Sequence, residues 1–199
     1  MLYLASGSPR RRELLTQIGV PFQLLKVNVD ESLRLGEAPL EYVQRLAAEK
    51  ARAGFEVLLQ QGLPQGCVLG ADTSVVIDGM ILGKPANRRE SIDILLALSG
   101  RSHDVITAIA LATPLGVKVT HSRTEVNFRT ISEEEAGAYW DTGEPADKAG
   151  AYGIQGLGAV FVERIKGSYT GVVGLPLFET ARLLQEAGVP VWQTVETES

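Results

Sequence analysis

Three arginines follow a serine-rich turn near the start of the chain and form a candidate anion site. Residues 6–12 read Ser-Gly-Ser-Pro-Arg-Arg-Arg, which predicts a helix with Ser8 as its N-cap and Pro9 at its first position. Cations at a helix N-terminus are disfavoured by up to about 1 kcal/mol each, because the helix dipole is already positive there. Free backbone N–H groups, the hydroxyls of Ser6 and Ser8 and the guanidinium groups would together suit a phosphate. The alternative is a solvated basic helix end.

Two cations lie on helix faces that are otherwise apolar. Arg11 shares a face with Leu14 and Ile18 of the first helix, so we expect its side chain to point inward. Lys50 lies in the same way on the apolar face of the helix expected over residues 40–55. A lysine in such a place either extends its ammonium group to solvent, which is the commoner outcome, or lines a cleft and meets an anion.

Acidic residues follow two of the expected strands. Asp72 comes directly after the apolar run 67–71, and Asp30 and Glu31 follow a strand expected over residues 22–29. A buried carboxylate is costly unless it is paired or binds a metal, and ligands of α/β sheets bind where strands end at a crevice. Each acid alone is better explained as a turn residue or an ion pair. Beside an arginine-rich anion site, these acids become candidate ligands for Mg²⁺ or Mn²⁺.

Two familiar catalytic motifs are absent from the sequence. Residues 83–85, Gly-Lys-Pro, do not complete a P-loop, because Gly79 is one position too close and Pro85 stands where a serine or threonine is needed. Lys84 remains a candidate phosphate ligand. The sequence has no Gly-x-Ser-x-Gly segment, which leaves a hydrolase with a serine nucleophile unsupported.

Length and composition exclude several classes of protein. The chain has 199 residues, which corresponds to a single domain, and we expect two lobes around a cleft. A net charge of −5 disfavours general binding to polynucleotides. Cys67 is the single cysteine, so an internal disulfide and a cysteine-based zinc site are excluded. The apolar start is too short for a signal peptide, and no run reaches the ~18 apolar residues of a membrane span, so we expect a soluble, cytoplasmic protein.

The hydrophobic pattern predicts helices and strands that alternate along the chain, as in an α/β or α+β domain. The glycine-rich segment 143–174 also carries aromatic and branched residues, so we expect an ordered loop whose backbone approaches a ligand. The tail after Trp192 is expected to fray. The expected strands cover residues 2–5, 22–29, 67–71, 105–112 and 120–130, a hairpin covers 74–82, and the expected helices cover 9–18, 40–55, 87–98, 133–141 and 176–188.

Eight short segments, in one order along the whole chain, carry a family resemblance. They are Leu-Ala-Ser-Gly-Ser-Pro-Arg-Arg (4–11), Val-Asp-Glu-Ser (29–32), Leu-Ala-Ala-Glu-Lys-Ala (46–51), Leu-Gly-Ala-Asp-Thr (69–73), Leu-Gly-Lys-Pro (82–85), Leu-Ser-Gly-Arg-Ser-His (98–103), Asp-Lys-Ala-Gly-Ala-Tyr-Gly-Ile-Gln-Gly (147–156) and Val-Gly-Leu-Pro (173–176). In this arrangement the chain resembles the Maf family of nucleoside triphosphate pyrophosphatases.

The resemblance implies an α/β fold in which a mixed twisted sheet and flanking helices form two lobes around a cleft, similar to the inosine triphosphate pyrophosphatases. It implies one Maf-like domain over residues 1–199, a cytoplasmic location and a homodimer. The implied reaction converts a nucleoside triphosphate into the monophosphate and pyrophosphate with a divalent cation, Mg²⁺ or Mn²⁺. Polynucleotides and membranes are not expected partners. The family's proton acceptor falls on Asp72.

Three positions divide the family by substrate. This chain carries Arg10, Thr73 and Gln155, and in these it is similar to enzymes that prefer dTTP and UTP. A sister group that prefers 7-methyl-GTP carries Trp, Gln and Glu at the same positions. The side chain of Gln155 has a donor and an acceptor, so its amide could pair with the N3–H and a carbonyl of uracil or thymine.

These roles combine into a mechanistic hypothesis. Asp72 orients or deprotonates a water that attacks the α-phosphorus, aided by a divalent metal held by Asp72 together with Glu31. Ser8, Arg11, Lys50 and Lys84 neutralise the triphosphate as pyrophosphate leaves.

Three other functions compete with this hypothesis. The same reaction could act on modified or purine nucleotides. Because Maf proteins have been associated with septum formation and division arrest, the chain could be a regulatory protein that binds a nucleotide as a signal. A non-catalytic anion-binding domain would require structural roles for Lys50 and Asp72.

Overall fold

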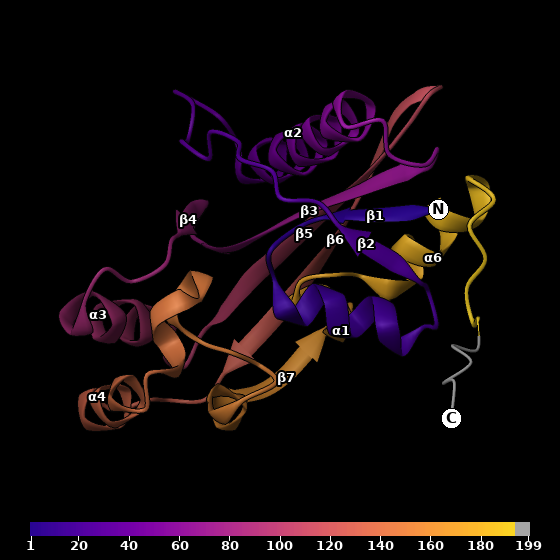
Figure 1. Cartoon of the computed structure of the whole chain (residues 1–199). Helices are drawn as coiled ribbons and strands as arrows, with labels where there is room; N and C mark the ends of the chain where they lie inside the picture. Colours follow the sequence, from indigo (N-terminus) through magenta and orange to yellow (C-terminus); the bar gives the residue numbers. More distant parts are fainter. Residues whose placement is uncertain (194–199) are drawn as a thin grey trace.

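A seven-stranded mixed sheet forms the centre of the protein in the computed structural model, which describes residues 1–193 (Figure 1). The strand order is β2-β1-β3-β5-β6-β7, and β4 pairs with β3 outside this path, so the expected α/β class with a mixed sheet is confirmed. The strands are β1 (Leu2–Ala5), β2 (Phe22–Leu24), β3 (Cys67–Ile77), β4 (Met80–Leu82), β5 (Ser102–Thr113), β6 (Gly116–Phe128) and β7 (Val162–Lys166). The helices are α1 (Pro9–Gln17), α2 (Pro39–Gln60), α3 (Arg88–Leu98), α4 (Glu133–Asp141), α5 (Tyr169–Val173) and α6 (Leu177–Glu186), with 3-10 turns η1 (Glu144–Asp147), η2 (Ala149–Ala151) and η3 (Leu157–Phe161).

Helices cover both faces of the sheet. Leu2 and Leu4 of β1 pack in a core with side chains of α1 and α6, whereas Tyr3 and Ala5 pack in a second core with α2. This alternation follows the two-residue period of a strand, and both faces of β1 are buried, which explains its uninterrupted apolar sequence. Figure 1 shows α2 on one side of the sheet and α1 and α6 on the other.

Capping residues set the starts of the helices largely as the sequence predicts. Asn87 accepts a hydrogen bond from the N–H of Glu90 at 3.0 Å, and Ser132 forms a capping box with Glu135. Ser8 takes the N-cap position of α1 as expected, but its side chain makes no capping hydrogen bond. Its hydroxyl therefore remains available to a ligand.

Strand β3 is longer than predicted. The expectation that it ends at Ala71 is wrong, because the strand continues to Ile77 and pairs with β5 from Val68 to Val76. The strand continues because its backbone hydrogen bonds to β5 extend past Ala71, although the polar side chains there interrupt the apolar sequence pattern. Asp72 consequently lies in the interior of a strand rather than at its end.

The other edge of β3 has a gap in its pairing. The parallel ladder with β1 ends where Ala5 faces Gly70, and the antiparallel ladder with β4 begins at Val75. Residues 71–74 have no strand partner on this edge among residues 1–193. We expected a ligand-binding crevice at the end of this strand, and the residues that were expected to line it lie beside this gap instead.

Two other segments differ from their predicted structure. The strand expected over 22–29 stops at Leu24, because its partner β1 is only four residues long and the pairing ends at Leu4. The segment 143–174, expected to be a loop, contains η1 to η3, β7 and α5. Helix α2 and strand β5 exceed their predicted ranges, and β6 begins and ends earlier than its predicted range. Most of the expected tail after Trp192 falls in residues 194–199, outside the described part.

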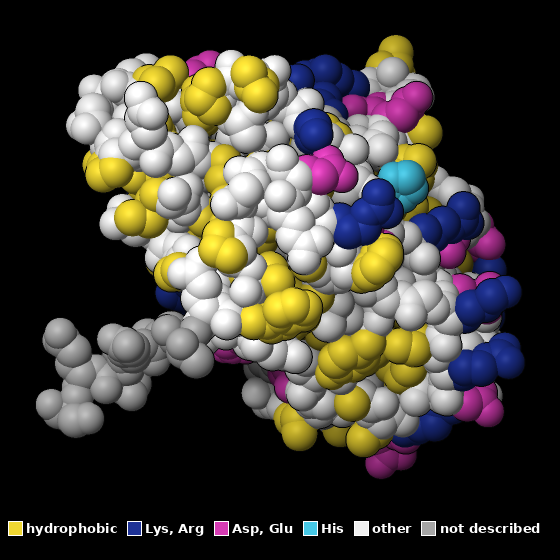
Figure 2. Space-filling view, turned by 90° about the vertical axis from the view of Figure 1, so that its right-hand side faces the viewer, with side chains coloured by type: hydrophobic (Ala, Val, Ile, Leu, Met, Phe, Trp, Pro, Cys, Tyr) yellow, Lys and Arg dark blue, Asp and Glu magenta, His cyan; other side chains and the backbone are white. Residues whose placement is uncertain are grey.

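The surface mixes charges of both signs. On the face shown in Figure 2, basic and acidic side chains lie next to each other along one side, and hydrophobic side chains are scattered over the rest. No helix among residues 1–193 combines the length and the apolar character that a membrane crossing requires.

The contact between α2 and β3 yields a stability prediction. A Cβ at Gly70 would lie 2.4 Å from the carbonyl oxygen of Ala47 and 2.6 Å from the amide nitrogen of Ala51. Gly70→Ala therefore forces helix and sheet apart, and overpacking of this kind costs about 1–3 kcal/mol. We expect thermal unfolding to show a melting temperature at least ~3 °C lower.

Gly83→Ala is the matched control, because a Cβ at Gly83 meets nothing within 4 Å. Its melting temperature should equal that of the wild type. An unchanged melting temperature for Gly70→Ala would contradict the close contact.

Candidate active site

A cleft of about 860 Å³ opens beside the gap in β3, and this volume is typical of small-molecule sites, which span ~300–1,000 Å³. Its walls come from the β1–α1 turn, α2, β3, the loop after β4 and the glycine-rich segment. The structure brings together all of the site residues expected from the sequence: Ser6, Ser8, Arg10, Arg11, Glu31, Lys50, Asp72, Thr73, Lys84 and Gln155. Their individual roles stay predictions.

Lys50 forms the centre of the cleft. Its Nζ lies 2.6 Å from Oε1 of Glu31 and 2.8 Å from Oδ1 of Asp72. Only 13% of the Lys50 side chain and 11% of the Asp72 side chain are exposed, whereas 58% of Glu31 is exposed. Lys50 therefore lines a cleft and does not extend to solvent, which decides between the two alternatives left open by the sequence.

The α2–β3 contact explains why these groups meet. Gly70 lets the backbone of α2 approach β3 at Ala47 and Ala51, and Lys50 directly precedes Ala51. Asp72 lies two residues after Gly70, so both project from the same face of the strand. The helix thus delivers an ammonium group to the only acidic side chain of β3.

The two carboxyl groups have opposite pKa shifts. Burial raises the pKa of Asp72, and the charges of Lys50 and Arg11 offset only part of that increase. The hydrogen bond from Lys50 lowers the pKa of Glu31, although partial burial opposes it. The raised pKa makes the Asp72 carboxylate a stronger proton acceptor than an ordinary aspartate, which is the direction that a general base requires.

The guanidinium group of Arg11 is buried and is largely occupied by the protein. Its Nε donates to the carbonyl of Gly174 at 2.8 Å, and its Nη1 donates to the carbonyl of Ala71 at 2.9 Å and to Oγ of Ser6 at 3.2 Å. Its Nη2 donates to Oγ1 of Thr73 at 3.1 Å. The inward orientation is confirmed. Four of the five N–H donors are used, so at most one remains for a phosphate.

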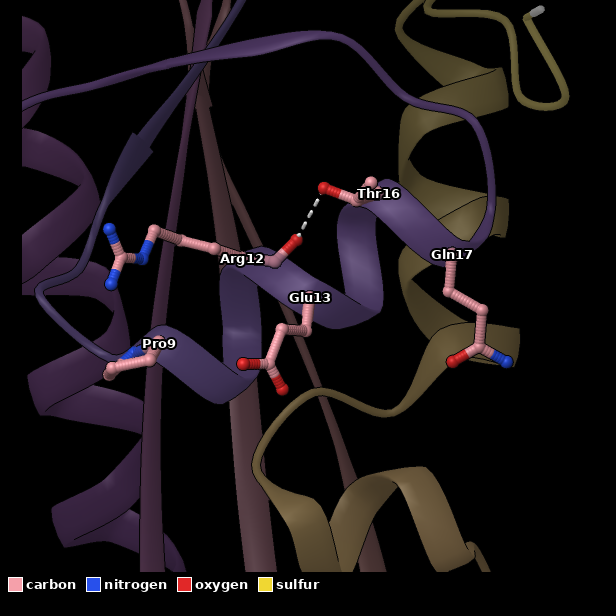
Figure 3. A pocket seen from close by; sticks show the side chains of 5 residues that line it. All are labelled: Pro9, Arg12, Glu13, Thr16 and Gln17. Carbon is pink, nitrogen blue, oxygen red and sulfur yellow. Dashed lines mark hydrogen bonds between the residues drawn. The ribbon is translucent and has the colours of Figure 1, made fainter.

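The expected convergence of three arginines is wrong for Arg12. Arg10 lines the cleft, but Arg12 lies over a separate hollow on the outer face of α1 (Figure 3). Thr16 donates a hydrogen bond to the carbonyl of Arg12 at 3.0 Å there. The hollow is lined by Pro9, Arg12, Glu13, Thr16 and Gln17, all from one helix. The 100° step between successive helix residues separates the neighbouring arginines.

Sequence reasoning missed the residues that anchor Glu31. The hydroxyl of Tyr42 donates to the carbonyl of Glu31 at 2.9 Å, and Arg45 donates to the carbonyl of Ser32 at 3.0 Å. Arg45 also binds the carboxylate of Glu37, and this hydrogen bond lowers the pKa of Glu37 to about 2. Tyr42 precedes Lys50 by eight residues, and this helical spacing could have identified it.

A divalent metal fits the acidic pair only together with another ligand. Glu31 and Asp72 offer the oxygen atoms that Mg²⁺ prefers, and they already hold the ammonium group of Lys50 between them. Within residues 1–193, no group of three or more His, Cys, Asp or Glu side chains could hold a metal by itself. Mg²⁺ commonly binds through one or two carboxylates, water and substrate phosphates, and the residues present fit that mode.

The Arg45–Glu37 pair yields a pH prediction. Because the folded pKa of Glu37 lies below its ordinary value of 4.5, the pair stabilises the fold above pH 4.5, and this contribution is lost as the pH falls toward about 2. Arg45→Met should return the pKa of Glu37 toward 4.5 and remove this contribution at neutral pH. Carboxyl NMR titration and urea unfolding at pH 7 and pH 3 measure the two effects.

Arg34→Met serves as the control, because Arg34 is 65% exposed and pairs with Glu49 through its side chain. It should change the pKa of Glu37 much less. A pKa of Glu37 that stays near 2 without Arg45 would refute the assigned cause.

Comparison with known proteins finds one family and several close relatives. Residues 1–187 match the family described as "Maf-like protein". The chain is 57% identical to a dTTP/UTP pyrophosphatase of Saccharophagus degradans over 194 residues, which are 98% of this chain and 92% of the relative. It is 53% identical to that of Hahella chejuensis over 96% and 94% of the two chains, and 52% identical to that of Aliivibrio fischeri over 93% and 97%.

Proposed function

The chain belongs to the Maf family, and we propose that it is a nucleoside triphosphate pyrophosphatase that hydrolyses dTTP and UTP to the monophosphate and pyrophosphate. Relatives more than half identical over nearly the whole length carry that name. The observation that carries the proposal is the Glu31–Lys50–Asp72 cluster in a cleft that also contains Gln155.

The cleft combines a base with cations, as phosphoryl transfer requires. Arg10, Lys50 and Lys84 line it and would neutralise the triphosphate, and the free hydroxyl of Ser8 would add a hydrogen bond. Ser6 already binds Arg11, so we assign both of them to shaping the turn, with one N–H of Arg11 left for a phosphate oxygen.

Asp72 acts as the general base in this proposal. It accepts a proton from a water molecule as the water oxygen bonds to the α-phosphorus. The bond between the α-phosphorus and the bridging oxygen breaks, and pyrophosphate leaves with that oxygen. Lys50 holds Asp72 in place and faces the charge that develops on the phosphates.

Glu31 and Asp72 would hold the divalent cation, Mg²⁺ or Mn²⁺. When bound, this cation supplies further neutralisation of phosphate charge. Glu31 suits the role because it is ionised over a wide pH range and more than half exposed. Lys50 would then share these carboxylate oxygen atoms with the cation.

Gln155 is exposed at the rim of the cleft, where it would contact the base. Its amide supplies a donor and an acceptor to uracil or thymine. Thr73 bonds to Arg11 and lies 2.9 Å from Oγ1 of Thr107, so we assign its influence on specificity to the shape of the cleft. The cytoplasm, where nucleoside triphosphates are used, is the proposed location, and the homodimer stays a prediction.

Pyrophosphate release is the first test. With Mg²⁺ or Mn²⁺, we expect turnover of dTTP and UTP well above that of CTP, GTP and 7-methyl-GTP, and none with EDTA. In ¹⁸O-labelled water, the label should enter the monophosphate, since the attack is on the α-phosphorus. Label in pyrophosphate would exclude this mechanism, and preference for 7-methyl-GTP would exclude the proposed specificity.

Asp72→Asn tests the base. Loss of a general base costs about 10²–10⁴-fold in rate, so we expect turnover to fall at least ~100-fold. Asp104→Asn is the control, because Asp104 pairs with Arg123 on β5 and β6 and does not line the cleft. Circular dichroism and thermal unfolding check the fold. Wild-type turnover by a folded Asp72→Asn variant would refute the role of Asp72.

A further inference from the structure

The turn that carries Gln155 surrounds a single carboxylate. Glu144 accepts three hydrogen bonds: from the hydroxyl of Tyr139 at 2.6 Å, from the N–H of Leu157 at 2.8 Å and from the N–H of Gly158 at 3.1 Å. The hydroxyl of Tyr139 in turn accepts the N–H of Gly153 at 3.1 Å. Both ends of the turn 153–156 are thereby tied to α4 and η1.

The glycines of this segment make room for that carboxylate. A Cβ at Gly156 would lie 2.2 Å from Oε2 of Glu144, and a Cβ at Gly158 would lie 2.6 Å from the hydroxyl oxygen of Tyr139. Neither glycine has the positive φ that would require glycine for conformational reasons. The glycine-rich sequence therefore serves a close approach by Glu144, in addition to any approach by a ligand.

Glu144 is ionised in this setting. Burial acts to raise its pKa, but the hydrogen bonds from Tyr139, Leu157 and Gly158 outweigh burial and hold the pKa below its usual value. The charge of Lys148 also lowers the pKa of Glu144, and its Nζ is held nearby by hydrogen bonds of 2.7 Å to the backbone carbonyl of Glu144 and 2.7 Å to the carboxylate of Asp147. Charge-assisted hydrogen bonds are about twice as strong as neutral ones, so the turn is held firmly.

The backbone of the turn has donors to offer. Gly156 donates to the carbonyl of Gly153 at 3.2 Å, which closes a turn with Ile154 and Gln155 at its centre. Within residues 1–193, the N–H groups of Ile154 and Gln155 form no hydrogen bond, and both residues line the cleft.

A fixed backbone donor distinguishes pyrimidines better than a glutamine side chain. The amide of Gln155 can turn about its last bond and exchange its donor and acceptor, so alone it suits cytosine as well as uracil. A backbone N–H can only donate: it matches the O4 acceptor of uracil or thymine and opposes the 4-amino group of cytosine. Discrimination then depends on how firmly the turn is held.

We propose that Tyr139 and Glu144 are positioning residues that fix the turn 153–156, so that its backbone donors and Gln155 select uracil and thymine over cytosine. The inference rests on the proposed function for its substrate class. Neither residue needs to contact the reacting phosphates. Substituting either one should therefore change how tightly the base is bound and not the rate of the chemical step.

Tyr139→Phe is the test variant. It removes the hydroxyl and keeps the ring, whose centroid lies 5.1 Å from that of Phe161 in the core. We expect the ratio of kcat/KM for dTTP to that for dCTP to fall about tenfold, through a higher KM for dTTP with kcat little changed. Glu144→Gln should act in the same direction, because its amide NH₂ would face an N–H or O–H donor. Amide hydrogen exchange at Gly153, Leu157 and Gly158 should become faster in both variants.

Tyr169→Phe and Glu134→Gln are matched controls, because both residues are exposed and neither lines the cleft. They should leave the selectivity ratio unchanged. If Tyr139→Phe slows all substrates equally, or leaves exchange in the turn unchanged, the positioning role is overturned while the pyrophosphatase stands.

A wild type that releases no pyrophosphate from any nucleotide would instead overturn the proposed function. Calorimetry with the non-hydrolysable α,β-imido analogues of dUTP and dCTP then decides the inference by itself. Preference for the uracil analogue that is lost in Tyr139→Phe supports it. Equal binding of both analogues by the wild type overturns it.

Discussion

The cleft depends on one close contact, in which helix α2 lies directly on strand β3 at Gly70. This contact places the ammonium group of Lys50 between the carboxylates of Glu31 and Asp72. Removing a carboxylate from water is costly, and a single lysine shared with Glu31 does not fully compensate that cost for Asp72, whose pKa stays raised. The same desolvation that weakens the ion pair raises the pKa of Asp72 and would make it a stronger base in the proposed reaction. The close approach of α2 to β3 at Gly70 thus determines both the position of Lys50 and the burial of Asp72 on which the proposed chemistry depends.

Two other residues of the cleft lie in segments without regular secondary structure, and contacts with neighbouring elements hold these segments in place. Glu31 lies in an irregular segment, which Tyr42 and Arg45 of α2 tie down through backbone carbonyls. Gln155 lies in a turn that Tyr139 and Glu144 tie to α4 and η1. The segments that carry these two site residues therefore have partners on a neighbouring helix or 3-10 turn. Rigid elements supply the precision that loops lack.

Much of this arrangement can be predicted from the sequence, and the failures have physical causes. Hydrophobic spacing places Arg11 and Lys50 on apolar helix faces, and capping residues locate α3 and α4, because these are local signals. Whether Lys50 extends to solvent or meets an anion is not local, because its partners Glu31 and Asp72 come from other segments. Strand length is not local: β3 continues past Asp72 because β5 pairs with it, and β2 stops early because β1 is short. The contacts of Glu144 could not be predicted for a similar reason. Its partners are up to 14 residues away, and the glycines that accommodate it resemble those of a ligand-binding loop.

The gap in β3 has a consequence for self-association. A strand edge without a partner normally offers its carbonyl and N–H groups to a strand of another molecule, which is a route to aggregation. In the proposed function a nucleotide enters the cleft beside this edge, and a further strand on β3 would fill that space. Arg11 solves the conflict by binding the carbonyl of Ala71 from the side, as a neighbouring strand would. A guanidinium group thus satisfies a carbonyl of the open strand edge that would otherwise be free to pair with a strand of a second molecule.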